Sequence, residues 1–212
     1  MPPATWVPTW SHQDVEIKEN NLVYEGFYKV RKLQLRHQCF SGQWSPWLIR
    51  EQVHHSDAAA VLLIDLKQQK LVMVEQCRIG MISSLNKNSP WMLEIVAGLI
   101  DQGESPEETV LREALEEAHC EIEKLHTIGE FYNSPGGFAE KTTLFCGITS
   151  ATGKEGIRGV GTEHEDIRVH VLDIDKVLEA FEQRIFPLSS STYIALQWLA
   201  LNLQNGHPFL KI

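Results

Sequence analysis

The stretch 98–120, GLIDQGESPEETVLREALEEAHC, decides the fold of the region around it. Ser105 is a favoured N-cap residue, Pro106 suits the first helical position, and Glu108 completes a capping box with Ser105. These residues predict a helix that begins at Ser105. Four apolar residues follow at helical spacing, namely Leu111, Ala114, Leu115 and Ala118. We expect this stripe to face a core.

Acidic residues crowd the same stretch. Nine Asp and Glu residues stand between positions 98 and 123, and Arg112 is the single Lys or Arg among them. Glu113 and Glu117, four residues apart, are neighbours on a helix, where like charges cost about 0.2–0.5 kcal/mol. We expect one arginine to be too little to neutralise the cluster. A hard cation that prefers oxygen ligands, such as Mg2+, can do so.

Six residues of this stretch stand at the spacing G-x5-E-x7-R-E-x2-E-E: Gly98, Glu104, Arg112, Glu113, Glu116 and Glu117. Chance matches at six fixed positions on a capped helix are far rarer than matches to a short motif. The pattern resembles the Nudix box, the signature of hydrolases that cleave nucleoside diphosphates linked to another group. A solvated acidic face on a packed helix is the plain alternative.

His119 departs from the box, which has glycine at this position. That glycine supplies a left-handed residue just past the helix C-terminus. Histidine adopts the left-handed conformation at modest cost. We expect the change to affect local geometry and to leave the ligand set intact.

The charge distribution bounds the domain organisation and the partners. The 212-residue chain has a net charge of −9, whereas sequence-independent binding of nucleic acid needs a basic surface. Residues 1–56 carry a net charge of +1, and residues 57–212 carry −10. This shift predicts a boundary near Ser56. The Nudix resemblance implies a hydrolase domain over residues 57–212, preceded by an N-terminal β domain over residues 1–56 that serves dimerisation and substrate recognition.

Cysteine spacing and hydropathy indicate the compartment. Cys39, Cys77, Cys120 and Cys146 form no C-x2-C pair and no evident disulfide framework. The N-terminus has no basic segment followed by an apolar run, and no apolar stretch approaches the length of a membrane span. We expect a cytoplasmic protein with reduced thiols and no membrane partner.

Runs of β-forming residues predict the remaining elements. A small antiparallel sheet is expected from strands at 22–30, 31–36 and 47–53. A second sheet is expected from strands at 58–66, 71–75, 91–98, 126–131, 143–149 and 167–171, followed by helices at 173–183 and 190–205. Strands between a motif helix and closing helices indicate an α/β fold with a mixed sheet. The Nudix resemblance implies the same architecture, an α/β/α sandwich.

Features outside the box resemble one subgroup of the Nudix hydrolases, the bacterial ADP-ribose pyrophosphatases. Pro135 stands sixteen residues after His119, a spacing similar to that of the subgroup. The segments 93–98 (LEIVAG) and 161–166 (GTEHED) are also similar to it. With residues 26–27 near the start and 195–199 near the end, the resemblance covers nearly the whole chain.

The resemblance implies a metal site and a general base. The expected ligands of Mg2+, or of Mn2+ in its place, are the carbonyl of Ala97 and the side chains of Glu113, Glu116, Glu117 and Glu165. Glu163 is the expected base, with Glu165 as its rival. Arg112 and Glu116 complete the catalytic set, Arg112 by orienting carboxylates, unless it is a plain i, i+4 partner of Glu116. Glu104 either braces the loop or assists the metal, and a plain surface acid ahead of the N-cap is its alternative.

Substrate recognition is expected from residues outside the box. Phe27 or Tyr28 can stack on adenine. Arg50 and Arg78 suit phosphates or the terminal ribose, because a guanidinium matches phosphate oxygens. Glu140 can accept hydrogen bonds from ribose hydroxyls. Each of these residues has an ordinary core or salt-bridge role as its alternative.

The resemblance implies an enzyme that acts on a small nucleoside diphosphate sugar. The first expectation is Mg2+-dependent hydrolysis of ADP-ribose to AMP and ribose 5-phosphate. A broader nucleotide-sugar pyrophosphatase, acting on ADP-sugars or GDP-mannose, is the near alternative, because the box leaves the terminal sugar open. A non-catalytic ADP-ribose-sensing module is the alternative of another class. The full set of Glu113, Glu116, Glu117 and Glu163 favours an enzyme.

A homodimer is also implied by the resemblance. In such a dimer the N-terminal sheet reaches across to a second subunit. Phe27 and Arg50 would then act in the site of the partner chain.

Overall fold

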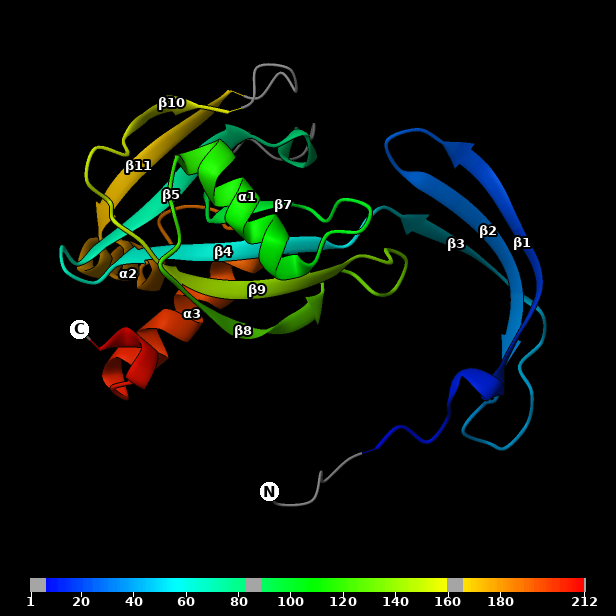
Figure 1. Cartoon of the computed structure of the whole chain (residues 1–212). Coiled ribbons are helices and arrows are strands. Elements are labelled where there is room, and N and C mark those ends of the chain that lie inside the picture. Colours follow the sequence, from blue (N-terminus) through cyan, green and yellow to red (C-terminus); the bar gives the residue numbers. More distant parts are fainter. Residues whose placement is uncertain (1–6, 83–88, 160–165, 212) are drawn as a thin grey trace. The chain divides into compact units, whose positions relative to one another are not determined.

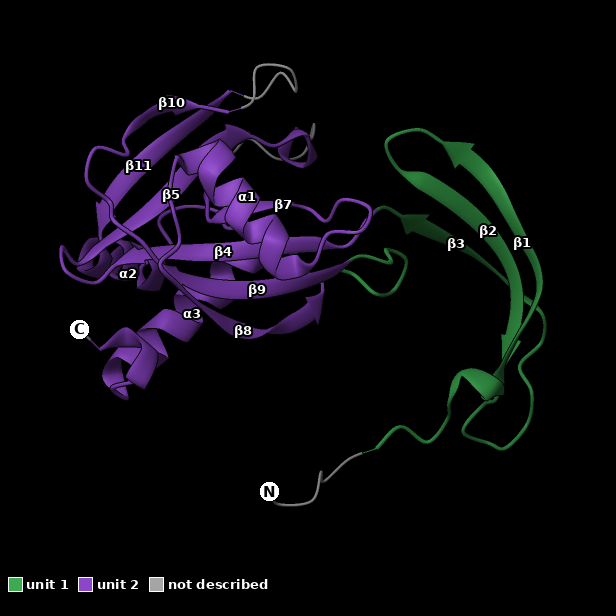
Figure 2. Cartoon of the chain, viewed as in Figure 1, with its two compact units in different colours: residues 1–55, 134–140 green, residues 56–133, 141–212 purple. Residues whose placement is uncertain are grey.

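The computed structural model describes residues 7–82, 89–159 and 166–211 and divides the chain into two compact units (Figures 1 and 2). The first unit combines Met1–His55 with Ser134–Glu140, and the second combines Ser56–Asn133 with Lys141–Ile212. Segment 134–140 follows the expected boundary in sequence and yet packs with the first unit, where Phe138 bridges to Val53. The functional division at residue 56 stays a prediction.

Three antiparallel strands form the sheet of the first unit, in the order β1-β2-β3. Their bounds are β1 Val15–Glu25, β2 Lys29–His37 and β3 Leu48–His54. The small antiparallel sheet is therefore confirmed. The strand expected at 22–30 is wrong, because the chain turns at residues 26–28, where the Gly26 amide donates to the Tyr28 carbonyl at 3.0 Å.

A mixed eight-stranded sheet forms the centre of the second unit, as predicted. Six strands follow the order β10-β11-β5-β4-β9-β8, while β6 pairs with β5 and β7 pairs with β4. The pair β4–β9 is parallel. The strand bounds are β4 Ala58–Asp65, β5 Lys70–Cys77, β6 Trp91–Glu94, β7 Val96–Leu99, β8 Lys124–Tyr132, β9 Lys141–Ile148, β10 Gly156–Arg158 and β11 Ile167–Asp173.

The expected strand at 91–98 is instead two strands with a break at Ile95. Strand β6 pairs with β5 and β7 pairs with β4, so the chain changes partners there. Ile95 is buried in the core at the break. Continuous β-forming residues gave no sign of this change. Strand β10 was not predicted either, because it is only three residues long.

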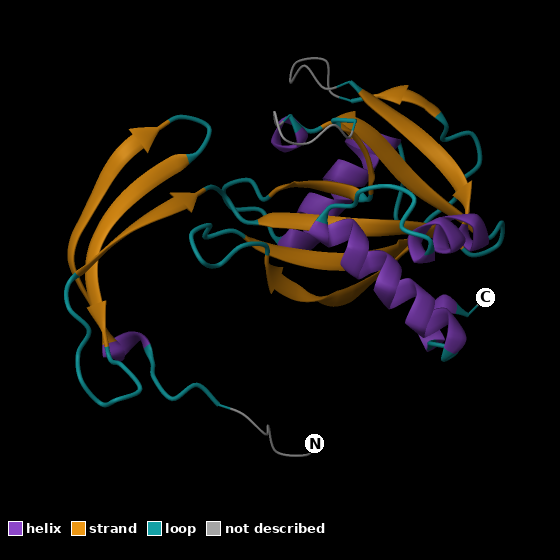
Figure 3. Ribbon diagram, turned by 180° about the vertical axis from the view of Figure 1, so that it is seen from behind, coloured by secondary structure: helices purple, strands orange, loops and turns teal. Residues whose placement is uncertain are grey.

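Helices cover both faces of this sheet, which confirms the α/β/α sandwich. Helix α1 (Pro106–Ala118) lies on one face, and α2 (Ile174–Glu182) and α3 (Ser190–Gln204) lie on the other (Figures 1 and 3). Strand β4 serves both cores because successive side chains point to opposite faces. Ala59, Val61 and Leu63 pack in the cluster of α1, whereas Ala60, Leu62 and Ile64 pack in the cluster of α2 and α3.

Helix α1 buries Ala114 and Ala118 as expected, but not the two leucines of the predicted stripe. Leu111 and Leu115 are 45% and 53% exposed. The buried positions are Thr109, Val110, Ala114, Glu117 and Ala118. The helix is turned so that a glutamate replaces leucine on the inner side, because the carboxylates of this helix meet the backbone of β7. Hydrophobic periodicity assigns the inner face of a helix from its apolar residues, and it therefore does not detect a helix whose inner face carries a glutamate.

Within the described part of the chain, no helix is both long and apolar enough to span a membrane.

Candidate active site

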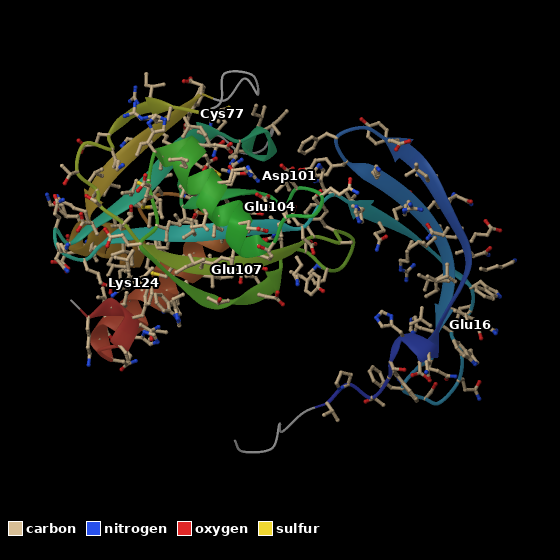
Figure 4. The ribbon with its side chains drawn as sticks, in the orientation of Figure 1. Glu16, Cys77, Asp101, Glu104, Glu107 and Lys124 are labelled. Atoms are coloured by element: carbon tan, nitrogen blue, oxygen red, sulfur yellow. The ribbon has the colours of Figure 1, made fainter. Side chains whose placement is uncertain are left out.

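The loop before α1 carries Glu104 of the box and leads into the first turn of that helix (Figure 4). The Ser105 hydroxyl accepts from the Glu108 amide at 3.2 Å, and the Glu108 carboxylate accepts from the Ser105 amide at 2.8 Å. This capping box confirms the predicted helix start. Glu104 lies just ahead of the cap, and its Oε2 accepts from the Thr109 hydroxyl at 2.8 Å. Glu104 therefore braces the loop against the helix.

Glu113 lies directly against the backbone of Gly98 in β7. A β-carbon at position 98 would stand 1.8 Å from Oε1 of Glu113, so no residue with a side chain fits there without displacing the carboxylate. The Glu113 side chain is only 12% exposed. The glycine that opens the box is thus required by the carboxylate fifteen residues later.

Glu117 occupies the next turn of the helix on the same side. It is 2% exposed, and its Oε2 accepts from the Ala97 amide at 3.4 Å. Glu113 and Glu117 therefore meet two successive residues of β7. A buried carboxylate is unfavourable unless positive or hydrogen-bonding groups surround it. The arrangement is one that a bound cation would stabilise.

Arg112 links three carboxylates of the box. Its Nη1 donates to Glu113 Oε1 at 2.7 Å and to Glu116 Oε2 at 3.0 Å, while Nε and Nη2 each donate to Glu104 at 2.9 Å. Orientation of carboxylates and the i, i+4 pair with Glu116 are both present. A single guanidinium fork thus engages three acids at once, but its one positive charge does not neutralise them.

These hydrogen bonds shift the pKa values of Glu104 and Arg112. The hydrogen bond from Arg112 lowers the pKa of Glu104 from 4.5 to about 2. The hydrogen bond to Glu104 in turn raises the pKa of Arg112. Both side chains are charged throughout the neutral range, so the loop and the helix stay joined by an ion pair.

The donor set suits a hard divalent ion in kind, because carboxylate and carbonyl oxygens are its preferred ligands. Over residues 7–82, 89–159 and 166–211, however, no three His, Cys, Asp or Glu side chains are grouped so as to hold a metal ion. Arg112 draws Glu113 and Glu116 towards itself, whereas Glu117 lies with Ala97. Glu163 and Glu165, the expected base and further ligand, lie outside the described residues.

The residues expected to bind adenine form part of an aromatic cluster in the first unit. Phe27 packs edge-on against Tyr28 at 4.9 Å between centroids and stacks at a tilt on His55 at 4.4 Å. Tyr28 also meets Phe138 edge-on at 5.9 Å. His55 and Phe138 were not predicted. They are far from Phe27 in sequence, and neither stands in a recognisable motif.

The other expected substrate residues differ in their surroundings. Arg50 lies on β3, where its Nη1 donates to the Ile49 carbonyl at 2.8 Å. Glu140 ends segment 134–140, immediately before β9. Arg78 follows β5 in the second unit, and its Nε donates to Glu94 at 2.5 Å. Glu94 was quoted in the sequence only as part of the segment 93–98 and was given no role.

His119 adopts the predicted left-handed conformation at the end of α1, with φ 52° and ψ 32°. Its amide donates to the Leu115 carbonyl at 3.0 Å, and the Cys120 amide donates to the Ala114 carbonyl at 2.8 Å. The Lys154 ammonium donates to the His119 carbonyl. The carbonyls of Ala114, Leu115 and His119 at the helix end therefore have hydrogen-bond partners without a glycine cap.

Comparisons with known proteins agree with this fold. A family model described as the NUDIX domain matches residues 54–190, and the chain belongs to this family. It is an enzyme of the hydrolase type that its relatives represent.

One relative, named ADP-ribose pyrophosphatase, is from Haemophilus influenzae. It is 37% identical over 91% of this chain and 89% of its own length. Another, named GDP-mannose pyrophosphatase, is from Cronobacter sakazakii and is 32% identical over 89% and 96%. A crystal structure of an ADP compounds hydrolase shares the fold, with a TM-score of 0.67 and 18% identity over 94% of this chain and 99% of that one.

Proposed function

We propose that this protein hydrolyses the pyrophosphate bond of ADP-ribose to AMP and ribose 5-phosphate in the presence of Mg2+. The observation that carries the proposal is the placement of Glu113 and Glu117 on successive turns of α1, against Gly98 and Ala97 of β7. The ADP-ribose pyrophosphatase of Haemophilus influenzae, with 37% identity, supports the choice of substrate.

Residues of α1 and β7, together with Glu165, would hold the divalent ion. Glu113 and Glu117 are the proposed ligands, joined by the carbonyl of Ala97 and by Glu116 and Glu165. When bound, such an ion neutralises the charge of the pyrophosphate and lowers the pKa of a water molecule. Mn2+ takes oxygen ligands as well and is expected to substitute for Mg2+.

The protein's own groups then position and deprotonate the nucleophile. Arg112 holds Glu113 and Glu116 through hydrogen bonds and so limits the positions that these carboxylates can take. Glu163 is proposed to accept the proton of the attacking water. A bond between one phosphorus and the bridging oxygen breaks, and both products leave as phosphate monoesters.

A product assay with the purified full-length chain tests this function. ADP-ribose, ADP-glucose, GDP-mannose and NADH are incubated separately with protein and Mg2+, and released mononucleotide is separated by chromatography. Release of AMP from ADP-ribose well above the other substrates is the expected result. Tight binding of ADP-ribose without any AMP would instead indicate a sensing module.

GDP-mannose is the second candidate substrate, because the relative from Cronobacter sakazakii is named for it. The two substrates differ in the base and in the sugar, while the diphosphate is the same. The box residues act on the diphosphate alone and therefore do not discriminate between them. Faster release of GMP than of AMP in the same assay would reverse our choice.

We further propose that the chain acts as a homodimer. In this arrangement Phe27, Tyr28 and Arg50 of one subunit serve the box of the other, with adenine stacked on an aromatic ring. Arg78 and Glu140 are proposed to contact the phosphates and the ribose. The exposure of Phe27, at 70%, supports its availability for stacking.

A further inference from the structure

Glu94 is an acidic residue buried within the second unit. It ends β6 and is 6% exposed, although carboxylates are rarely buried unless they are paired. Its partner is Arg78, whose Nε lies 2.5 Å from Glu94 Oε2. Removing the Glu94 carboxylate from water carries a desolvation cost that a single ion pair often does not repay in stability. Stability alone therefore gives little reason for this pair.

The sheet register places the pair on the face that carries the box. Glu94 stands opposite Val74 in the β5–β6 pair, and directly opposite residues share a face. Val74 belongs to the cluster packed around Val110 and Ala114 of α1. The neighbouring pair, Glu75 and Leu93, points to the face of α2 and α3. Glu94 therefore lies on the same side of the sheet as Glu113 and Glu117.

Arg78 has hydrogen-bonding capacity beyond this pair. Its side chain is 40% exposed, whereas that of Glu94 is 7% exposed. Among the described residues, its hydrogen-bonding partner is Glu94, which engages only Nε. An arginine fork carries five N–H donors and matches phosphate oxygens in two-point contacts. The buried carboxylate holds one edge of the fork, and toward the described residues the opposite edge makes no hydrogen bond that would keep an anion from it.

We propose that Glu94 is a positioning residue that fixes the guanidinium of Arg78 for binding the diphosphate of the substrate. The inference rests on the proposed function, because it assumes a nucleoside diphosphate sugar as substrate. Glu94 itself does not touch the substrate. Holding an arginine rotamer in place lowers the ordering cost of binding, so the effect falls on affinity.

A double-mutant cycle on the full-length chain tests this role. Glu94→Gln, Arg78→Gln and the double variant are compared with the wild type. Kd is measured by calorimetry with the non-hydrolysable α,β-methylene analogue of ADP-ribose and Mg2+, and KM and kcat are measured with ADP-ribose. Glu94→Gln should raise KM and Kd about tenfold, equal to about 1.4 kcal/mol, and leave kcat within about twofold. In the Arg78→Gln background the same change should alter Kd less than about twofold.

Glu75→Gln is the matched control. Glu75 lies on β5 and pairs with His170 at 2.8 Å, on the opposite face of the sheet. This variant also removes a carboxylate from a side-chain hydrogen bond and should leave KM within about twofold of the wild type. Arg78→Gln leaves a buried carboxylate without its partner, which can prevent folding. Arg78→Lys replaces it in the cycle if circular dichroism shows an unfolded chain.

The outcomes separate this inference from the proposed function. An unchanged Kd in Glu94→Gln, a loss confined to kcat, or a full tenfold effect in the Arg78 background would each overturn the positioning role. A wild type that binds the analogue and releases no AMP would overturn the function, and the Kd of Glu94→Gln would still decide the role of the pair. A wild type that binds no analogue would overturn both.

Discussion

Oxygen Oε1 of Glu113 and the α-carbon of Gly98 are packed so closely that a β-carbon on residue 98 would stand 1.8 Å from that oxygen. Glycine is required here because only a residue without a side chain lets the carboxylate approach so closely. The φ of Gly98 lies outside the left-handed region, so backbone conformation is not the reason for glycine at this position. A carboxylate thus rests on the backbone of β7 without an intervening side chain. This relationship leads to the first prediction.

Gly98→Ala should lower kcat/KM for ADP-ribose about a hundredfold, the effect of moving a reacting group by about 1 Å. The added methyl group displaces Glu113 and the hydrogen bond that it receives from Arg112. Gly129→Ala is the control, because a β-carbon there has open space around it. Steady-state AMP release measures both variants. Equal activity of the two would show that Glu113 does not act at this place.

Glu117→Gln should reduce turnover by about 10²–10³-fold, as expected when one preorganised electrostatic group is lost. The fold should stay intact, because the amide has nearly the same volume as the buried carboxylate. AMP release and thermal unfolding are measured together. Glu107→Gln, an exposed change on the same helix, should retain full activity. Wild-type rates for Glu117→Gln would show that the metal assignment is wrong.

Glu163→Gln should slow turnover by about 10²–10⁴-fold, the usual contribution of a general base. The affinity for Mg2+, measured by calorimetry, should change little, because a base does not ligate the ion. The adjacent His164→Gln controls for a change in the same segment and should keep its activity. If Glu163→Gln lost turnover and metal affinity in equal measure, Glu163 would belong to the ligand set.

The depressed pKa of Glu104 predicts a pH-dependent contribution to stability. Its folded pKa of about 2 lies below the ordinary value of 4.5, so the contribution is complete above pH 4.5 and is lost as pH falls towards 2. Urea unfolding at several pH values in this window should show wild type and Glu104→Gln converging as pH falls. Glu107→Gln controls for the loss of one charge. A constant difference between wild type and Glu104→Gln would contradict the shift.

Subunit complementation tests whether Phe27 serves the site of a partner chain. Phe27→Ala and Glu117→Gln chains, each of low activity alone, are unfolded, mixed and refolded together. In a mixed dimer one site receives Phe27 from one chain and Glu117 from the other, so activity should rise above the sum of the separate chains. No gain, despite a dimer by analytical ultracentrifugation, would place both residues in one chain's site.

Local signals predicted the framework of the second unit correctly. Ser105 and Glu108 define the helix start by a capping box, and the apolar run that became β4 is buried on both faces. Prediction failed where tertiary packing decides. Leu111 is exposed because α1 turns its acids inward towards β7, and the break at Ile95 exists because the chain changes strand partners there.

In the candidate site, too, local signals predicted some features, while tertiary packing decided others. The box residues are brought together because one helix and one strand carry them. Glu94 and Phe138 were not assigned roles, because their importance depends on partners in other elements, Arg78 and Tyr28. The spacing of residues in the sequence does not predict contacts of this kind between different elements. Glu163 and Glu165 rest on the resemblance alone and stay predictions.

The capped end of α1 bears on how freely this kind of site can vary. Lys154, in the loop after β9, donates to the carbonyl of His119, so the helix terminus is secured from outside its own segment. With that support, position 119 tolerates a bulky ring in a left-handed conformation. A signature that insisted on glycine there would reject this enzyme. The motif is better defined by its carboxylates and by the strand against which they pack than by a fixed residue type at every position.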